Sequence, residues 1–301
     1  MATATPTTSL MRTYRYLRIG IAGTIIALFV SVGISATQVG LLPSLSNYYF
    51  TPARDAFVGA LIAASLALFA LSGRGVERAL LDAAALFAPL IAFIPTTLGP
   101  GNIARIVVPC QFRCFPPEYE AIAAAGVITY LVMGVLIVIL VLILARRRQV
   151  SLGAVSVSLT FAIIVLVTLA VGWIFFRDFV LDQGHAIATV AFFSLFAAVA
   201  VRGAFPRLGA PPRRRFKAAY ILIAFTLILV LGVYVYAELN GYVERIDFPV
   251  ALIAETVALA LFGAFWIVQC VELWDEPDPA ASRVHSQPEP QPQHRGRPDE
   301  A

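Results

Sequence analysis

Ser46, Asp55, His185 and Glu255 are the residues of this 301-residue sequence whose side-chain types could together do chemistry. A serine hydroxyl becomes a nucleophile when a histidine takes its proton, and a carboxylate can orient that histidine or act as an acid or base. Such a set could hydrolyse a lipid at a membrane surface. It could equally bind a ligand without any reaction, and we therefore keep the four residues as candidates for both roles.

Glu255 is the most informative of the four, because it stands alone among Ala, Ile, Val and Leu in the apolar stretch 250–271. A helix that starts near Pro249 would place Glu255 about six residues in, or roughly 9 Å deep at 1.5 Å per residue. An acid at that depth should be paired, protonated or turned toward a polar cavity. We predict that Asp55, His185 and Glu255 line one polar cavity open toward the outer leaflet.

Tyr49 and Arg54 complete the set of candidate ligand-binding residues, since they precede Asp55 in the same polar segment. Each candidate also has a plainer interpretation. Tyr49 fits an aromatic belt at the membrane interface, and Arg54 could pair with an external acid. Asp55 could be a favourable acid at a helix N-terminus, and His185 an interfacial hydrogen-bonding residue.

Cys110 and Cys114 lie four residues apart between prolines in the segment 99–120. If this loop is external, it lies in an oxidising compartment, and the spacing predicts a disulfide, with two free thiols as the alternative. Zinc would need two further ligands, which the loop does not contain. We predict neither a metal site nor a cofactor.

The elements that position these residues are membrane-spanning helices. Hydrophobic residues make up 59% of the chain and charged residues 13%, whereas soluble proteins carry about 25% charged residues. The apolar stretches are continuous and do not alternate as barrel strands do, so helices are expected to cross the lipid. The sequence predicts an all-α polytopic transmembrane helical bundle of about eight spans, at residues 19–42, 56–71, 79–98, 121–144, 152–176, 185–201, 218–236 and 250–271.

The arginines orient this bundle. Loops on one side hold 17 of the 22 basic residues, and the other side holds Arg54, Arg105, Arg113, Arg177 and Arg245. The positive-inside rule then places both termini in the cytoplasm. We expect a cytoplasmic segment at 1–18 with disordered first residues, a transmembrane domain at 19–274, and a disordered proline-rich cytoplasmic tail at 275–301. A cleaved signal peptide at the first span is the alternative, which would leave seven spans.

Residues 43–59, with the sequence PSLSNYYFTPARDAFVG, resemble an uncharacterised family of bacterial multi-pass membrane proteins. The sequence is also similar to that family at residues 184–189 (GHAIAT), where a histidine opens a span, and at Glu255 in the last span. A vaguer likeness links it to the Frag1/DRAM-like membrane proteins. The resemblance implies a bacterial inner (plasma) membrane and supplies no activity, and the loop with two cysteines departs from it.

Three functions remain open from the sequence. The first is a non-enzymatic protein that binds or organises membrane lipid, or a membrane partner, through an outer-leaflet polar cavity. The second is an intramembrane lipid hydrolase, although the zinc-dependent membrane hydrolases use several histidines and only His185 lies in the apolar body. The third is a proton-coupled transporter. Nucleic-acid binding is not expected, because the basic clusters are explained by topology and by anionic lipid. We favour the first function, without enzymatic activity.

Overall fold

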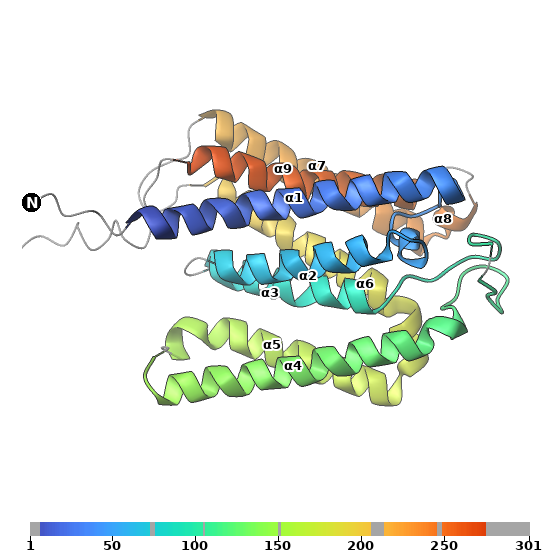
Figure 1. Cartoon of the computed structure of the whole chain (residues 1–301), viewed down its shortest axis with the longest axis horizontal. Helices are drawn as coiled ribbons and strands as arrows, with labels where there is room; N and C mark the ends of the chain where they lie inside the picture. The colour runs from blue at the N-terminus through green and yellow to red at the C-terminus, as the bar shows by residue number, and fades with distance from the viewer. Residues whose placement is uncertain are drawn as a thin grey trace, which may run out of the picture.

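The computed structural model describes residues 7–72, 76–104, 106–149, 152–205, 214–245 and 249–274. Long α-helices that lie alongside one another dominate these residues (Figure 1). They are α1 (Thr7–Val39), α2 (Arg54–Leu71), α3 (Val76–Phe93), α4 (Glu120–Arg146), α5 (Leu152–Phe175), α6 (Arg177–Gly203), α7 (Arg214–Leu239) and α9 (Val250–Glu272). The short helical turns are η1 (Ser46–Phe50), η2 (Pro117–Tyr119) and α8 (Tyr242–Arg245). No strand forms in the described residues, so the prediction of an all-α bundle is confirmed at this level.

Seven of the described helices are long and apolar enough to cross a membrane, namely α1, α2, α4, α5, α6, α7 and α9. Helix α3 is not among them, because it carries three charged residues, Glu77, Arg78 and Asp82, in its first two turns. Asp82 is nevertheless buried, since it pairs with Arg78 at 3.5 Å and accepts a hydrogen bond from Ser158 of α5 at 2.7 Å. These findings fit a multi-pass membrane protein. The count of eight spans stays a prediction that depends on α3.

Helix α3 lies between α2 and α6 (Figure 1) and packs closely against both. Small residues make this close approach feasible, as in other membrane bundles, because they let helix backbones come near each other. Ala84, Ala85 and Ala88 of α3 are fully buried. Toward the end of the bundle where α6 and α9 finish, a cluster of rings packs α6 against α9, with the ring centre of Phe196 4.6 Å from that of Phe262 and 5.0 Å from that of Phe265. Helices α4 and α5 lie at the edge of the bundle (Figure 1) and expose most of their apolar side chains.

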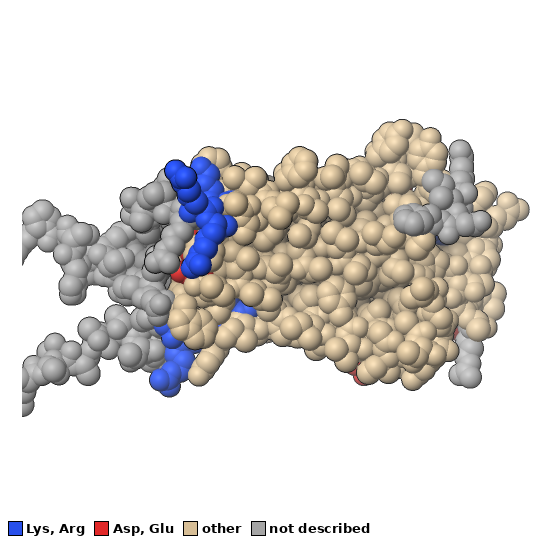
Figure 2. Space-filling model, turned by 90° about the horizontal axis from the view of Figure 1, so that it is seen from above, with Lys and Arg blue, Asp and Glu red and all other residues tan. Residues whose placement is uncertain are grey.

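Basic residues collect at one end of the bundle. Figure 2 shows Lys and Arg side chains near the end where α1 begins, and a largely uncharged surface along the rest of this face. Helices α1, α3, α5 and α7 begin at that end, and α2, α4, α6 and α9 finish there. We call this the inner end and the opposite one the outer end. The arrangement agrees with the expected segregation of arginines, while the membrane and the side on which the termini lie stay predictions.

Several predicted boundaries change. Helix α1 begins at Thr7, so residues 7–18 extend the first helix and are no separate segment. Helix α6 begins at Arg177, so Arg177, Asp178 and Asp182 are helical and do not form a loop before the sixth span. Helix α3 ends at Phe93, because Pro95 disfavours a helical conformation at the residue before it. The expected disorder of residues 1–6 and of the tail 275–301 falls outside the described residues.

The topology can be tested with reporter fusions in the connections between helices. We expect fusions to alternate between the two sides of the membrane, beginning outside, because the basic residues segregate to one end. Two consecutive fusions reporting the same side would contradict eight spans. The fusions at Ser72 and Arg113 test α3, which is not among the seven helices that are apolar enough to cross a membrane. The fusion points are Phe50, Ser72, Arg113, Arg148, Phe176, Ala204 and Asn240.

Candidate functional site

Ser46, His185 and Glu255 meet at the outer end, although they come from η1, α6 and α9. The Nε2 atom of His185 lies 3.0 Å from the Oγ atom of Ser46. The Ser46 hydroxyl donates to Oε1 of Glu255 at 3.0 Å, and the Ser46 backbone N–H donates to Oε2 at 2.9 Å. The Ser44 hydroxyl also donates to Oε2, at 2.8 Å. We call these four residues the polar cluster. It accounts for an acid within an apolar helix, because Glu255 receives three hydrogen bonds from two serines.

The end of α3 fixes the position of His185. The last carbonyls of a helix lack partners within the helix, and Pro95 prevents α3 from continuing past Ile94. The Ile94 carbonyl instead accepts a hydrogen bond from Nδ1 of His185 at 2.8 Å. His185 is only 4% exposed, so both ring nitrogens are held by protein atoms in a buried place. The histidine therefore joins the end of α3 to the polar cluster.

Nδ1 of His185 faces a carbonyl oxygen, so it carries a proton, and Nε2 is the ring nitrogen that faces Ser46. The Ser46 hydroxyl therefore lies within hydrogen-bond distance of both the imidazole ring and the Glu255 carboxyl group.

A small cavity of about 30 Å³ adjoins His185 and Glu255. A cavity of that size holds a water molecule but no lipid. Three of its residues, Asp182, His185 and Thr189, are spaced three and four apart along α6, so they lie on one face of that helix. We call it the ion cavity because ionisable side chains line it; its remaining lining residues are Thr96, Thr97, Arg113, Gln183, Ala186, Tyr234, Glu238 and Glu255.

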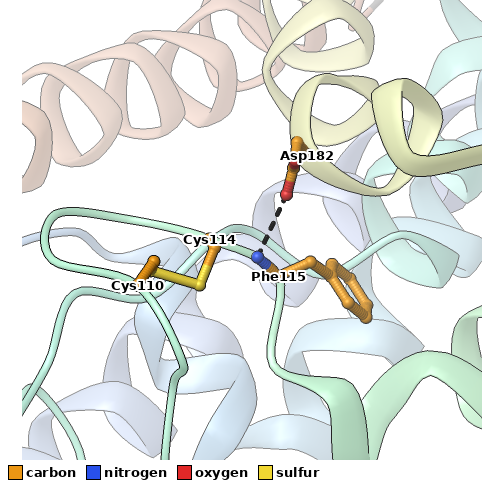
Figure 3. The surroundings of a disulfide bond; sticks show 4 residues. All are labelled: Cys110, Cys114, Phe115 and Asp182. Atoms are coloured by element: carbon orange, nitrogen blue, oxygen red, sulfur yellow. Dashed lines mark hydrogen bonds between the residues drawn. A yellow bond between two sulfur atoms is a disulfide. The ribbon is translucent and has the colours of Figure 1, made fainter.

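The loop between α3 and α4 covers the ion cavity. Cys110 and Cys114 form a disulfide in it, with Cα atoms 6.2 Å apart (Figure 3). Cys114 exchanges two backbone hydrogen bonds with Leu98, at 3.0 and 3.1 Å, and the Phe115 N–H donates to Oδ1 of Asp182 on α6 at 3.1 Å (Figure 3). Arg113 lies within the disulfide ring and pairs with Glu238 of α7 at 3.6 Å. The disulfide thus closes a ring that holds Arg113 at the cavity.

Asp55, Arg54 and Tyr49 lie outside the ion cavity. Asp55 is exposed in the first turn of α2, so the predicted cavity forms around His185 and Glu255 without it. Arg54 donates to the Tyr49 hydroxyl at 3.1 Å and lies 4.9 Å from the centre of its ring. The Tyr49 ring is buried against Phe50 and Phe57. This pair packs the outer end of α2 beside the polar cluster.

Ser44, Asp182 and Arg113 were not among the predicted site residues. A signal existed for Asp182, because its spacing from His185 places both on one face once the stretch before residue 185 is taken as helix. A signal also existed for Ser44, which stands two residues before Ser46. Nothing in the sequence indicated Arg113, whose position depends on how a long loop folds back over three helices.

Oxidation of the loop can be tested directly. We expect Cys110 and Cys114 to resist a membrane-impermeant maleimide until a reductant is added, because their sulfurs are bonded to each other. Cys270 is buried at the other end of the bundle and serves as an internal control that should stay unlabelled throughout. Labelling of either loop cysteine without reduction would contradict the disulfide in cells.

The described residues contain no group of three or more His, Cys, Asp or Glu side chains that could hold a metal ion. Comparison with protein-family models, curated proteins and solved structures finds no match to this chain. The resemblance to bacterial membrane proteins and its implied membrane therefore stay expectations. The fold and the site define a multi-pass helical membrane protein with a buried polar cluster at one end.

Proposed function

We propose that this chain is a non-enzymatic membrane protein that binds a membrane lipid at its outer end. The single observation that carries the proposal is a groove of about 570 Å³ beside the polar cluster, which we call the outer groove. Its lining is contributed by the segment that follows α1 and by η1, by the disulfide loop, by α8 and by the start of α9. The lining residues are Leu41, Leu42, Pro43, Ser44, Asn47, Gly99, Pro100, Asn102, Gln111, Phe112, Arg113, Val243, Pro249, Val250 and Ala251.

The lining suits an amphipathic ligand. Leu41 and Phe112 are highly exposed apolar side chains, and on the same groove Ser44, Asn47 and Arg113 present polar groups. The Oδ1 atom of Asn47 is buried and has no hydrogen-bond partner among the described residues. Binding sites combine an apolar lining with a few polar groups that fix orientation. A lipid head group beside Asn47 and an acyl chain along Leu41 and Phe112 would use both kinds of surface.

The outer groove, and not the ion cavity, supplies the room for such a ligand. The sequence-based proposal placed lipid in a cavity lined by His185 and Glu255, but about 30 Å³ excludes it. Ser44 connects the two places, because it lines the outer groove and donates to Glu255. In this proposal the polar cluster holds Ser44 in place at the wall of the groove, and the lipid contacts Ser44 without reaching Glu255 or His185.

Filling the outer groove should expel the lipid. We expect Val250→Trp to reduce several-fold the lipid that stays with the purified protein, measured by native mass spectrometry and lipid extraction, because the indole ring would occupy the groove. Ile253→Trp is the matched control, since Ile253 is exposed on the same helix and does not line the groove. Equal retention by the two variants would contradict lipid binding in the groove.

Lipid hydrolysis remains the second candidate, and one distance favours it. Ser46 and His185 lie 3.0 Å apart, which is the separation of a nucleophile and its general base. Ser46, however, lines neither the ion cavity nor the outer groove. An ester carbonyl therefore has no path to the hydroxyl. We expect a fluorophosphonate probe to leave Ser46 unmodified, and labelling that is lost in Ser46→Ala would favour the hydrolase instead.

A further inference from the structure

We infer that an anionic phospholipid, from the leaflet at the inner end, binds in a second groove with its phosphate on Arg202. This groove has a volume of about 720 Å³, and we call it the inner groove. It is a different space from the outer groove, so the inference does not rest on the proposed function. Helices α3, α6 and α7 contribute its lining, which consists of Leu80, Val190, Ser194, Ala197, Ala198, Val201, Arg202, Ile228, Leu231, Gly232 and Val235.

The inner groove runs lengthwise along α6. Its lining on that helix extends from Val190 to Arg202, which is about 18 Å at 1.5 Å per residue. Apart from Ser194 and Arg202, the side chains that line it are apolar, and α6 and α7 are both apolar enough to cross a membrane. A groove of this kind between two spans meets hydrocarbon and not water, so an acyl chain is the ligand that matches it.

The dimensions of the inner groove favour a lipid over a helix of a second copy of this chain. Spread over about 18 Å, a volume of about 720 Å³ corresponds to a cross-section of about 40 Å². A helix with its side chains is about 10–12 Å across, which is about 80–110 Å² in cross-section. Extended acyl chains are narrower than a helix. A side chain added at Gly232 would meet no atom within 4 Å, so the groove is open down to the backbone of α7.

Arg202 selects the head group. It lies in the last turn of α6, at the inner end, where it is exposed and forms no ion pair with a residue that the structure describes. A guanidinium can bind a phosphate through two parallel N–H donors. Arg214, Arg215 and Lys217 at the start of α7 add positive charge at the same end, which favours a head group with a net negative charge.

Arg202 also has a simpler role, because a cation is favourable at the C-terminus of any helix. Arg146 occupies the equivalent position in the last turn of α4, is exposed, and lines neither the inner nor the outer groove. The two arginines therefore share the helix-end role, and only Arg202 has an apolar groove beside it. A comparison of the two separates recognition of a lipid from the general effect of a basic residue at the inner end.

The test uses the full chain with Val250→Trp, so that the outer groove is filled and does not contribute. The protein is placed in nanodiscs of phosphatidylglycerol and phosphatidylcholine, and native mass spectrometry counts each lipid that stays with it. We expect phosphatidylglycerol to be retained in preference to phosphatidylcholine. Arg202→Gln should reduce the retained phosphatidylglycerol several-fold. Gly232→Trp should reduce it as strongly, because the indole ring would occupy the open space of the groove.

Arg146→Gln and Gly33→Trp are the matched controls and should retain phosphatidylglycerol as the parent does. Gly33 of α1 also has open space around it and does not line the inner groove. Equal losses in Arg202→Gln and Arg146→Gln would mean that charge at the inner end acts without the groove. Full retention in Gly232→Trp would mean that no acyl chain lies there, and a dimer that this variant dissociates would mean that a second copy covers the groove. Any of these results, or equal retention of the two lipids, would overturn the inference.

Discussion

Replacing the half-buried Glu255 with leucine is expected to lower the free energy of unfolding by about 3–5 kcal/mol, the usual result of removing one partner from a polar network whose other members are buried. The reason is that the Ser44 hydroxyl, the Ser46 hydroxyl and the Ser46 N–H would all lose their acceptor. Glu255→Gln keeps one carbonyl oxygen, so we expect it to cost only about 1 kcal/mol, as for one ordinary hydrogen bond. Reversible unfolding in detergent measures both values.

Asp55→Leu is the matched control for Glu255. Asp55 is also an acid at the outer end of a helix, but it is exposed and lies outside the ion cavity. Its loss should cost at most about 1 kcal/mol, the contribution of an acid at a helix N-terminus. If Glu255→Leu and Glu255→Gln were equally tolerated, Glu255 would reach the water on its own, and the polar cluster would not hold it.

Replacing His185 with leucine is expected to have the second largest effect, about 3 kcal/mol or more, because it breaks the same buried network from the other side. The Ile94 carbonyl at the end of α3 would lose its partner, and Ser46 would lose the contact with Nε2. His185→Gln retains an N–H group that can donate to the Ile94 carbonyl, so it should recover part of the loss. Unfolding in detergent again gives the measurement.

A local signature distinguishes this account from a general packing defect. In His185→Leu, hydrogen exchange should increase at the end of α3 and in residues 94–98, which His185 ties to α6. The inner ends of α6 and α9 pack through aromatic rings far from His185 and should keep their protection. Uniform loss of protection along the whole bundle would show that His185 does not act through Ile94.

Helix positions were largely predictable from the sequence, because about twenty apolar residues must form a helix to satisfy their backbone in lipid. Helix α9 begins at Val250 as predicted, and α5 begins at Leu152 as predicted. The start of α6 was missed, since Arg177, Asp178 and Asp182 are polar enough to resemble a loop but continue the helix outward. A fall in hydropathy along the sequence predicts where a span leaves the lipid. The helix can continue beyond that point, as α6 does.

The part of the candidate site that could be predicted from the sequence is the meeting of His185 and Glu255. Glu255 had to find a partner, and His185 was the one histidine in the apolar body, so bringing them together followed from the energetics of charge in a membrane. Asp55 does not line the ion cavity, although the sequence predicts it on the same side of the membrane as His185 and Glu255. It points to the exposed face of α2, and a single residue at a helix start does not reveal that direction. The Ile94 carbonyl is a backbone acceptor, which a search for reactive side chains does not consider.

The coupling of His185 and Glu255 through Ser46 is tested most directly by a double-mutant cycle in which His185→Leu and Glu255→Leu are made singly and together. Two residues joined through Ser46 should be coupled, because removing one already disrupts the contacts of the other. We predict that the double variant loses less stability than the two single losses added together, by about 1–3 kcal/mol. Additive losses would contradict a common polar cluster and leave His185 and Glu255 as independent residues at the same end of the bundle.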